Sequence, residues 1–458
     1  MIIKIFPKTN EGNSSVITIA PESADITFRR FIETGEIKLR VQDTEVLDLI
    51  CGLFIFEALL RDKKYGSFKG ELSGNEHIQI EMNFLRPEMS SELETYLTYL
   101  LTFSLGTSIT LSVTSKGLGG QMTLLEASKS DGAICLFSGG ADSFTGILTT
   151  KNTIERTTGI FVSHAMLRKL VEVELRPWMK SKGIDIKVIK IPKGSESVQQ
   201  LRGFVYTAIA GIVAYYCGIN KIIISEIGPV MFQPSYDILD EVTITTHPAT
   251  IELTKKILYA FYGKKFDIQT PFKMLTKSEA VSLAKDNSII KITNSCRSTM
   301  FSNSKYPNCG RCLGCLVRRI SFIVAGIEKG MDDGYAWDVF IKGEGESVNG
   351  RGKKWKVGKE SFSDLFQILN FADSVLRDSI PSTSATKIDD YDLKELFYRF
   401  SLDVMAAAYL MYEDHKIGRN HLVEEIYNNL KSNNLINVEM LKRRIREVRE
   451  GRFTPTFK

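Results

Sequence analysis

Two groups of residues in this 458-residue chain have types and spacings that could do chemistry. The first is the segment Ser138-Gly139-Gly140-Ala141-Asp142-Ser143, which follows an apolar run ending at Phe137. Glycines between a strand and a helix allow positive φ and let the backbone approach a ligand closely. The free amides and the positive dipole end of the following helix favour an anion at this point. The segment therefore predicts a phosphate-binding loop, to which Ser138 and Ser143 can add hydroxyl donors.

The bound group is expected to be a pyrophosphate. No lysine follows the glycines in the Gly-x-x-x-x-Gly-Lys-Ser/Thr arrangement, in which a lysine reaches the outer phosphates. Backbone amides and hydroxyls must therefore hold the anion. An ordinary tight turn is the alternative, and the apolar strand before the glycines disfavours it. The residues predicted to form this pyrophosphate-binding loop are Phe137, Ser138, Gly139, Gly140, Ala141, Asp142 and Ser143.

The second group is a set of cysteines. Four of the seven, Cys296, Cys309, Cys312 and Cys315, form the pattern Cys-x12-Cys-x2-Cys-x2-Cys. Thiolates suit zinc, and the Cys-x2-Cys spacing lets one short turn present two of them. Because four thiolates close the coordination sphere, we assign the zinc a structural role. An iron-sulfur cluster is the alternative, and no redox chemistry elsewhere in the chain favours it.

The region that carries both groups alternates between strands and helices. Strands are expected at 134–137, 159–162, 185–189 and 221–225, with helical stretches between them, the first from about 142 to 150. This alternation predicts an α/β fold with a doubly wound, Rossmann-like parallel sheet. Ligands of such sheets bind at the carboxyl ends of the strands, where the glycine segment lies.

Two further domains are expected around this core. Residues 1–128 combine strands at 2–6, 36–41, 77–84 and 108–114 with helices, one of them at 44–61, and form an N-terminal α/β domain. Residues 129–330 form the nucleotide-binding domain. Residues 331–458 begin with a Gly/Lys/Ser-rich segment at 342–359, expected to be an exposed linker.

The end of the chain is expected to be a C-terminal helical domain. Helical periodicity appears at 361–377, 390–412, 419–430 and 438–450. The last of these segments places basic residues between apolar ones at 441–446, as a surface helix would.

Composition limits the class of protein. With 43% hydrophobic and 25% charged residues the chain has the composition of a globular protein. A net charge of +5 falls short of a dedicated nucleic-acid binder, so nucleic acid is not expected as a direct substrate. The apolar runs at 49–60 and 204–219 are shorter than the ~18 residues of a membrane span, and residues 2–6 alternate like a strand rather than a signal peptide. We expect a cytoplasmic protein with no membrane attachment.

The glycine segment matches Ser-Gly-Gly-x-Asp-Ser and so resembles the PP-loop ATP pyrophosphatase family. Members of that family cleave ATP between the α and β phosphates to adenylate a substrate. The segment from Cys309 to Cys315, with Cys296 upstream and Arg318 after it, looks like the zinc loop of the 7-cyano-7-deazaguanine synthase (QueC) family. That family joins such a loop to a PP-loop in one domain.

Two further segments carry the QueC resemblance. Thr270-Pro271 followed by Leu275-Thr276-Lys277-Ser278-Glu279 is similar to the family's Thr-Pro and Leu-Thr-Lys-x-Glu segments. Arg202-Gly203 stands where the family has Arg-Asn. The resemblance covers about residues 131–322, and it fails at Phe161-Val162-Ser163-His164, where a Tyr-Gly-Gln pattern is usual. His164 at this strand end could contact a ligand or be structural.

The resemblance implies an ATP-dependent C–N ligase with ATP, Mg²⁺ and Zn²⁺ as cofactors. A carboxylate of a 7-deazaguanine small molecule would attack the α phosphate, pyrophosphate would leave, and an amine would displace AMP. The implied catalytic residues are Asp142, Arg202 and Lys277. In the resemblance Lys277 faces the reaction site, where a cation stabilises charge on a phosphate or carboxylate. The alternative for Lys277 and Arg202 is a solvated surface position.

The flanking domains suggest a setting. Long QueC-like proteins of this layout resemble components of bacterial antiphage operons, the Qat and related CBASS systems, in which a partner protein from the same operon would supply the acceptor amine at its amino terminus. Three alternatives stay open. They are the queuosine-pathway synthase, which makes a nitrile, a tRNA-modifying ATP pyrophosphatase, and a nucleotide-sensing scaffold without turnover.

Overall fold

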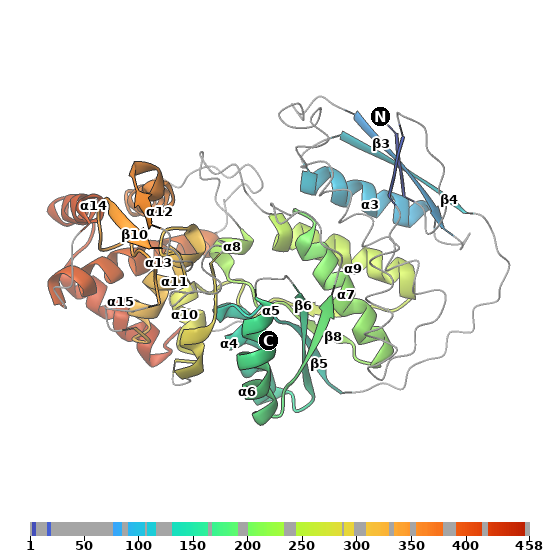
Figure 1. Ribbon diagram of the computed structural model, residues 1–458, viewed down its shortest axis with the longest axis horizontal. Helices are drawn as coiled ribbons and strands as arrows, with labels where there is room; N and C mark the ends of the chain where they lie inside the picture. The colour runs from blue at the N-terminus through green and yellow to red at the C-terminus, as the bar shows by residue number, and fades with distance from the viewer. Residues whose placement is uncertain are drawn as a thin grey trace.

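The computed structural model describes fifteen ranges of the chain (Figure 1). They are 2–5, 16–19, 77–84, 90–105, 108–115, 131–163, 167–190, 200–232, 244–285, 288–296, 308–328, 334–348, 354–378, 391–414 and 420–453. The strand expected at 36–41, the helix expected at 44–61, and His164 lie outside these residues.

The centre of the fold is a five-stranded sheet in the order β7-β6-β5-β8-β9, in which every pair of neighbours is parallel. Its strands are β5 (Ala133–Leu136), β6 (Thr157–Ser163), β7 (Asp185–Lys190), β8 (Lys221–Ile223) and β9 (Asp267–Gln269). The chain runs outward from β5 through β6 to β7, then returns to β8 on the other side of β5. The predicted doubly wound α/β fold is therefore confirmed, and its switch point lies between β5 and β8. Strand β9 was not expected.

Helices cover both faces of this sheet. Successive side chains of β5 alternate, so that Ala133 and Cys135 join one apolar cluster while Ile134 joins another. The first face packs against α4 (Ala141–Thr153) and α6 (Arg176–Ser181) and the second against α7 (Arg202–Tyr216) and α9 (Pro248–Tyr262). The apolar run at 204–219 is thus largely a buried helix. Within the described residues, no helix combines the length and apolarity needed to cross a membrane.

A second parallel sheet lies at the amino-terminal side, in the order β2-β1-β3-β4. Its elements are β1 (Ile2–Ile5), β2 (Val16–Ile19), β3 (His77–Phe84), α3 (Ser90–Leu105) and β4 (Ser108–Ser115). The predicted strands at 2–6, 77–84 and 108–114 are confirmed, whereas β2 was not expected. Helix α3 packs on α9, and Leu93 and Leu97 belong to the same apolar cluster as α9, which connects this unit to the core (Figure 1).

The C-terminal helices form one continuous apolar cluster with the first face of the core sheet. They are α12 (Ser363–Leu376), α13 (Tyr391–Tyr409), α14 (His421–Ser432) and α15 (Val438–Glu450). All four predicted helices are confirmed to within two residues at their starts. On the left of Figure 1, α12, α13 and α15 pack against α11 (Leu313–Val324), α15 also packs against α10 (Lys277–Ser282), and α14 packs on α12 and α13.

The segment predicted as an exposed linker is partly ordered sheet. Strands β10 (Gly345–Val348) and β11 (Lys354–Val357) pair antiparallel, with Ser347 opposite Trp355. Val357 is fully buried. The Gly- and Lys-rich composition hid this hairpin, because its short strands carry few apolar residues.

Glycine 146 lets α4 approach the carboxyl end of β8. A Cβ atom at Gly146 would lie 1.8 Å from Ser225 Oγ and 2.2 Å from Ser225 Cβ. We expect Gly146→Ala to destabilise the protein by about 1–3 kcal/mol, because two tightly packed elements must separate. Chemical denaturation measures this loss. Gly343→Ala, at an exposed glycine with no atom within 4 Å of the added Cβ, is the matched control and should change little. Equal stabilities for the two variants would contradict the packing.

Candidate active site

The loop after β5 is held in shape by its own serine hydroxyls. Ser143 Oγ accepts a hydrogen bond from the Ser138 amide at 3.1 Å and donates one to Gly140 O at 3.0 Å. It also lies 3.0 Å from Ser138 Oγ, which in turn accepts from the Gly140 amide at 3.3 Å. These bonds fold the loop into a tight turn. Ser138 is exposed whereas Ser143 is buried, so Ser143 organises the turn and Ser138 faces outward.

Gly139 is required by backbone conformation and by space. Its φ is +79°, in the left-handed region, and an added Cβ would lie 2.9 Å from Val171 Cγ2. The Gly139 carbonyl accepts a hydrogen bond from the Asn294 amide at 3.1 Å, so the loop is also tied to the segment that leads to Cys296. The glycine loop and the cysteine cluster are therefore structurally coupled.

The amino terminus of α4 faces this loop. Gly140 is the N-cap residue and, among the described residues, no side chain caps this end of the helix. The first amides of α4 and its dipole thus point toward the loop, as an anion site requires. Ala141, the first helical residue, is fully buried.

Phe137 differs from the other predicted ATP-binding residues. Its side chain is buried in the first apolar cluster, and its amide donates to Ile160 O at 2.9 Å as an extension of the sheet. Phe137 therefore anchors the loop rather than offering a donor to a ligand.

Lys277 and Asp142 meet directly. Lys277 Nζ lies 2.6 Å from Asp142 Oδ2, and the two side chains are only 7% and 16% exposed. Asp142 is in the first turn of α4, and Lys277 is the first residue of α10. Because a long chain separates these residues, the fold brings the two predicted catalytic groups together. Lys277 is therefore not a solvated surface residue.

The other carboxylate oxygen of Asp142, Oδ1, has a different environment from Oδ2. Asp142 Oδ1 is buried and, in the part of the chain that the structure describes, accepts no hydrogen bond. A buried carboxylate oxygen without a partner is costly unless a ligand satisfies it. Carboxylate oxygen is also the donor that Mg²⁺ prefers, usually alongside water and phosphate. The residues at this point therefore fit the Mg²⁺ that accompanies ATP.

Glu226 was missed by the sequence analysis. It lies just beyond β8, at the switch point beside β5, and is half-buried. Burial and then the negative charge of Asp142 raise the pKa of Glu226 to about 7, and the cations Lys277 and Arg202 oppose this shift. A carboxyl group that titrates near neutral pH among other charged groups is typical of an active site. The signal in the sequence was an acid directly after an apolar strand in an α/β sheet.

Arg202 lies at the edge of the charged group formed by Asp142, Lys277 and Glu226. It is the first residue of α7 and is exposed, and its charge acts on Glu226. Gly203 follows it because an added Cβ would lie 1.7 Å from the Thr245 carbonyl oxygen. This close approach explains why glycine replaces the asparagine that the resemblance led us to expect.

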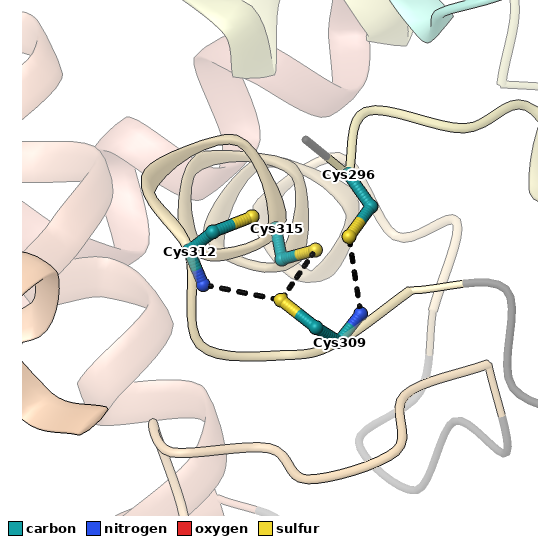
Figure 2. A group of neighbouring side chains, drawn as sticks. All are labelled: Cys296, Cys309, Cys312 and Cys315. Carbon is teal, nitrogen blue, oxygen red and sulfur yellow. Dashed lines mark hydrogen bonds between the residues drawn. The ribbon is translucent and has the colours of Figure 1, made fainter. Parts of the chain in front are cut away.

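The four cysteines form a compact cluster (Figure 2). Their Sγ atoms lie within 4.8 Å of one another, and all four residues are buried. Cys312 and Cys315 lie at the start of α11, whereas Cys309 and Cys296 come from two separate loop segments (Figure 2). The pattern in the sequence therefore brings together the residues that it predicted.

The cluster has the dimensions of a zinc site. A tetrahedral site with Zn–S bonds of about 2.3 Å places its sulfur atoms about 3.8 Å apart. Cys309 Sγ and Cys315 Sγ are 3.8 Å apart. The amides of Arg311 and Cys312 donate to Cys309 Sγ at 3.5 and 3.4 Å, as expected for a thiolate acceptor. The donor set thus fits zinc.

A buried ion network supports the cysteine loop. Arg318 Nη1 donates to Glu328 Oε1 and Arg319 Nη1 to Glu328 Oε2, both at 2.7 Å, and Arg319 Nε donates to Asp338 Oδ2 at 2.7 Å. Arg318 also donates to the Tyr335 hydroxyl. Both arginines are almost fully buried, so Arg318 stabilises the fold around the cluster rather than facing the glycine loop.

The five-stranded parallel sheet, with the glycine loop at its switch point, agrees with the Rossmann-like PP-loop core that the resemblance predicted. Residues 196–326 match the family model described as queuosine biosynthesis protein QueC. This match supports a QueC-like, ATP-dependent enzyme that modifies a nucleotide. No curated protein matches the chain. The matched region contains Lys277, Glu226 and the four cysteines, whereas the glycine loop lies before it.

Zinc content is the direct test of the cysteine cluster. We expect the purified chain to hold one zinc ion, because four buried thiolates close one tetrahedral site. Cys312→Ser should lose the metal and unfold at a lower temperature, since metal binding and folding are coupled. Elemental analysis and thermal denaturation measure the two effects. Cys217→Ser, outside the cluster, should keep the zinc. Iron in place of zinc, or full zinc retention by Cys312→Ser, would contradict the assignment.

Proposed function

We propose that this protein is an ATP-dependent C–N ligase that adenylates the carboxylate of a 7-deazaguanine and then transfers the acyl group to an amine. The observation that carries the proposal is the Lys277–Asp142 pair at the start of α4, where, among the described residues, no side chain caps the helix and buried Asp142 Oδ1 accepts no hydrogen bond. The match to the queuosine biosynthesis family supports the substrate class.

The glycine loop binds the leaving group. The Gly139 and Gly140 backbone, the first amides of α4 and the Ser138 hydroxyl would hold this anion at the switch point. In the first step a carboxylate oxygen bonds to the α phosphorus while the bond between the α phosphorus and the bridging oxygen to the β phosphorus breaks. The electron pair leaves with pyrophosphate, whose charge these donors stabilise.

Charged side chains stabilise the reacting phosphate. Lys277 lies where its ammonium can approach the α phosphate or the attacking carboxylate, and Asp142 orients it. Asp142 Oδ1 would hold Mg²⁺, which neutralises phosphate charge when bound. Arg202, exposed at the edge, is placed to contact the outer part of the substrate.

Glu226 is assigned the base of the second step. The amine nitrogen bonds to the acyl carbon, the bond from that carbon to AMP oxygen breaks, and the nitrogen must lose a proton. A carboxylate with a pKa of about 7 is half-ionised at neutral pH and can accept that proton.

The acceptor amine is proposed to come from a partner protein in a bacterial antiphage system. The N-terminal sheet and the C-terminal helices, which flank the region matched to the family, supply surface for such a partner. Reaction with ammonia and repeated activation of the amide would instead give a nitrile, the queuosine-pathway outcome that the description of the matched family favours.

Release of AMP and pyrophosphate tests the proposal. Mg-ATP is incubated with the chain and 7-carboxy-7-deazaguanine, alone, with ammonia, or with candidate partner proteins. We expect release that depends on the deazaguanine, and the acceptor that forms a stable product identifies the second step. Release with every carboxylate, or none with any acceptor, would overturn the proposal and favour a nucleotide-sensing scaffold.

The role of Lys277 in AMP formation can be tested by comparing it with Lys273 in the same segment. Lys277→Met should lower kcat for AMP formation by about 10²–10³-fold, the usual effect of removing one charge-stabilising donor. Lys273→Met changes an exposed lysine four positions earlier and should leave kcat within about twofold, since surface changes have small effects. Steady-state kinetics at saturating ATP separate the two. Similar rates for both variants would contradict the role of Lys277.

The role of Glu226 as a base predicts how the rate of AMP formation depends on pH. Because the carboxylate is the active form, AMP formation with an amine acceptor should rise as pH increases through about 7. Glu226→Gln should lower the rate and remove this rise, whereas Glu172→Gln, outside the site, should keep it. A pH–rate profile under single-turnover conditions is the measurement. An unchanged inflection in Glu226→Gln would exclude Glu226 as the base.

A further inference from the structure

Helix α10, which carries Lys277, begins with a capping box. The Glu279 amide donates to Thr276 Oγ1 at 3.4 Å, and the Thr276 amide donates to Glu279 Oε2 at 2.9 Å. Both residues are fully buried. The capping box explains why the helix begins at Lys277, but it leaves one oxygen of Glu279 and the Thr276 hydroxyl proton to be satisfied elsewhere.

The C-terminal helices satisfy those remaining groups. Thr276 Oγ1 donates to Asp403 Oδ2 of α13 at 2.6 Å. Arg444 of α15 donates through Nη1 to Glu279 Oε1 at 2.8 Å and through Nε to Asp403 Oδ1 at 2.8 Å. Arg444 Nη2 lies 3.3 Å from Thr276 Oγ1. The Thr276 hydroxyl thus donates once and accepts twice, which is its full capacity.

A second arginine completes the network. Arg399 of α13 donates to Glu279 Oε1 and, through Nη2, to Met274 O at 2.9 Å. Two carboxylates and two guanidinium groups therefore balance, and Arg444 and Asp403 are only 2% and 1% exposed. The spacing of apolar and basic residues in the last helix predicts surface positions for the basic ones, and for Arg444 this prediction is wrong.

Lys277 lies between Thr276 and Glu279, the two residues that this network holds. Thr276 precedes Lys277 and Glu279 follows it by two residues, and α13 and α15 bind both side chains. A planar guanidinium that bonds two carboxylates fixes direction as well as distance. The C-terminal helices thus fix the backbone of Lys277. Its side chain extends to Asp142, where Lys277 Nζ lies 2.6 Å from Asp142 Oδ2.

We propose that Arg444 and Asp403 are positioning residues that hold Lys277 against Asp142, so that the C-terminal helices are a working part of the ATP site. The inference rests on the proposed function for its catalytic consequence, though not for its structural one. Movement of α15 or α13 would move Lys277, because side chains of these helices bond to Thr276 and Glu279 on either side of it.

The alternative is that the network only stabilises the fold. Removing one partner of any buried ion pair is destabilising, whatever the pair is near. A test must therefore compare variants of similar stability. Val423 is fully buried in α14, which packs on α12 and α13, so Val423→Ala destabilises the same helices by leaving a cavity.

Chemical labelling of Lys277 is the first test, and it needs no catalytic activity. The full-length chain is treated with an amine-acylating reagent, and the rate at Lys277 is followed by peptide mass spectrometry. Arg444→Lys keeps the positive charge but loses the planar guanidinium that bonds both carboxylates. We expect Lys277 in this variant to be labelled about tenfold faster than in the unaltered chain, because the contact between α15 and the start of α10 opens more often. Val423→Ala should label at the unaltered rate at temperatures where it is folded.

Kinetics provide the second test. Arg444→Lys should lower kcat for AMP formation by about 10–100-fold with little change in KM for ATP, as expected for a misplaced catalytic group. Val423→Ala should keep both constants. If Arg444→Lys does not fold, Asp403→Asn is measured in the same two ways.

The outcomes separate the two proposals. If the unaltered chain forms no AMP but Arg444→Lys exposes Lys277, the proposed function fails and the positioning role stands. If the chain is active and Arg444→Lys matches it in labelling and in kcat, the positioning role is overturned. Equal labelling of Lys277 in Arg444→Lys and Val423→Ala would also overturn it.

Discussion

The ion pair between Lys277 and Asp142 is the interaction on which the rest of the site depends. Both side chains are mostly buried, and removing two charges from water is costly unless their surroundings are well arranged. The fold supplies that arrangement from two directions. Asp142 is fixed by the first turn of α4, which the serine hydroxyls and the Gly139 carbonyl set in place, and Lys277 by the start of α10.

The surrounding parts of the chain act through these two anchors. The cysteine cluster is tied to the glycine loop through Asn294, whose amide binds the Gly139 carbonyl and whose side chain accepts from the Cys296 amide at 2.7 Å. Asp364 of α12 accepts from the Leu313 amide at 2.7 Å and so caps the helix that carries two of the thiolates. The C-terminal helices therefore support both the metal centre and the lysine.

Much of this arrangement is local in the sequence and could be predicted from it. A strand followed by two glycines, an acid and a serine makes its own turn, and closely spaced cysteines can be recognised by spacing alone. The strands of the core sheet follow from apolar runs that both faces of a parallel sheet bury. The exception is β9, whose three residues are too few to form a pattern.

The parts that sequence did not reveal depend on distant pairing. Asp403 and Thr276 are 127 residues apart and Arg444 and Thr276 are 168, so no local pattern marks Arg444 as buried. The shifted pKa of Glu226 likewise arises only when burial and Asp142 act on it together. Such residues look like ordinary surface charges until the fold places a partner beside each one.

A crystal structure of the full chain with a non-hydrolysable ATP analogue and Mg²⁺ tests the central claim most directly. The account predicts the terminal phosphates against the Gly139–Gly140 backbone and the first amides of α4, with Mg²⁺ at Asp142 Oδ1 and Lys277 directed at the α phosphate. A nucleotide bound away from this loop, or a Lys277–Asp142 pair that makes no contact with it, would contradict the account.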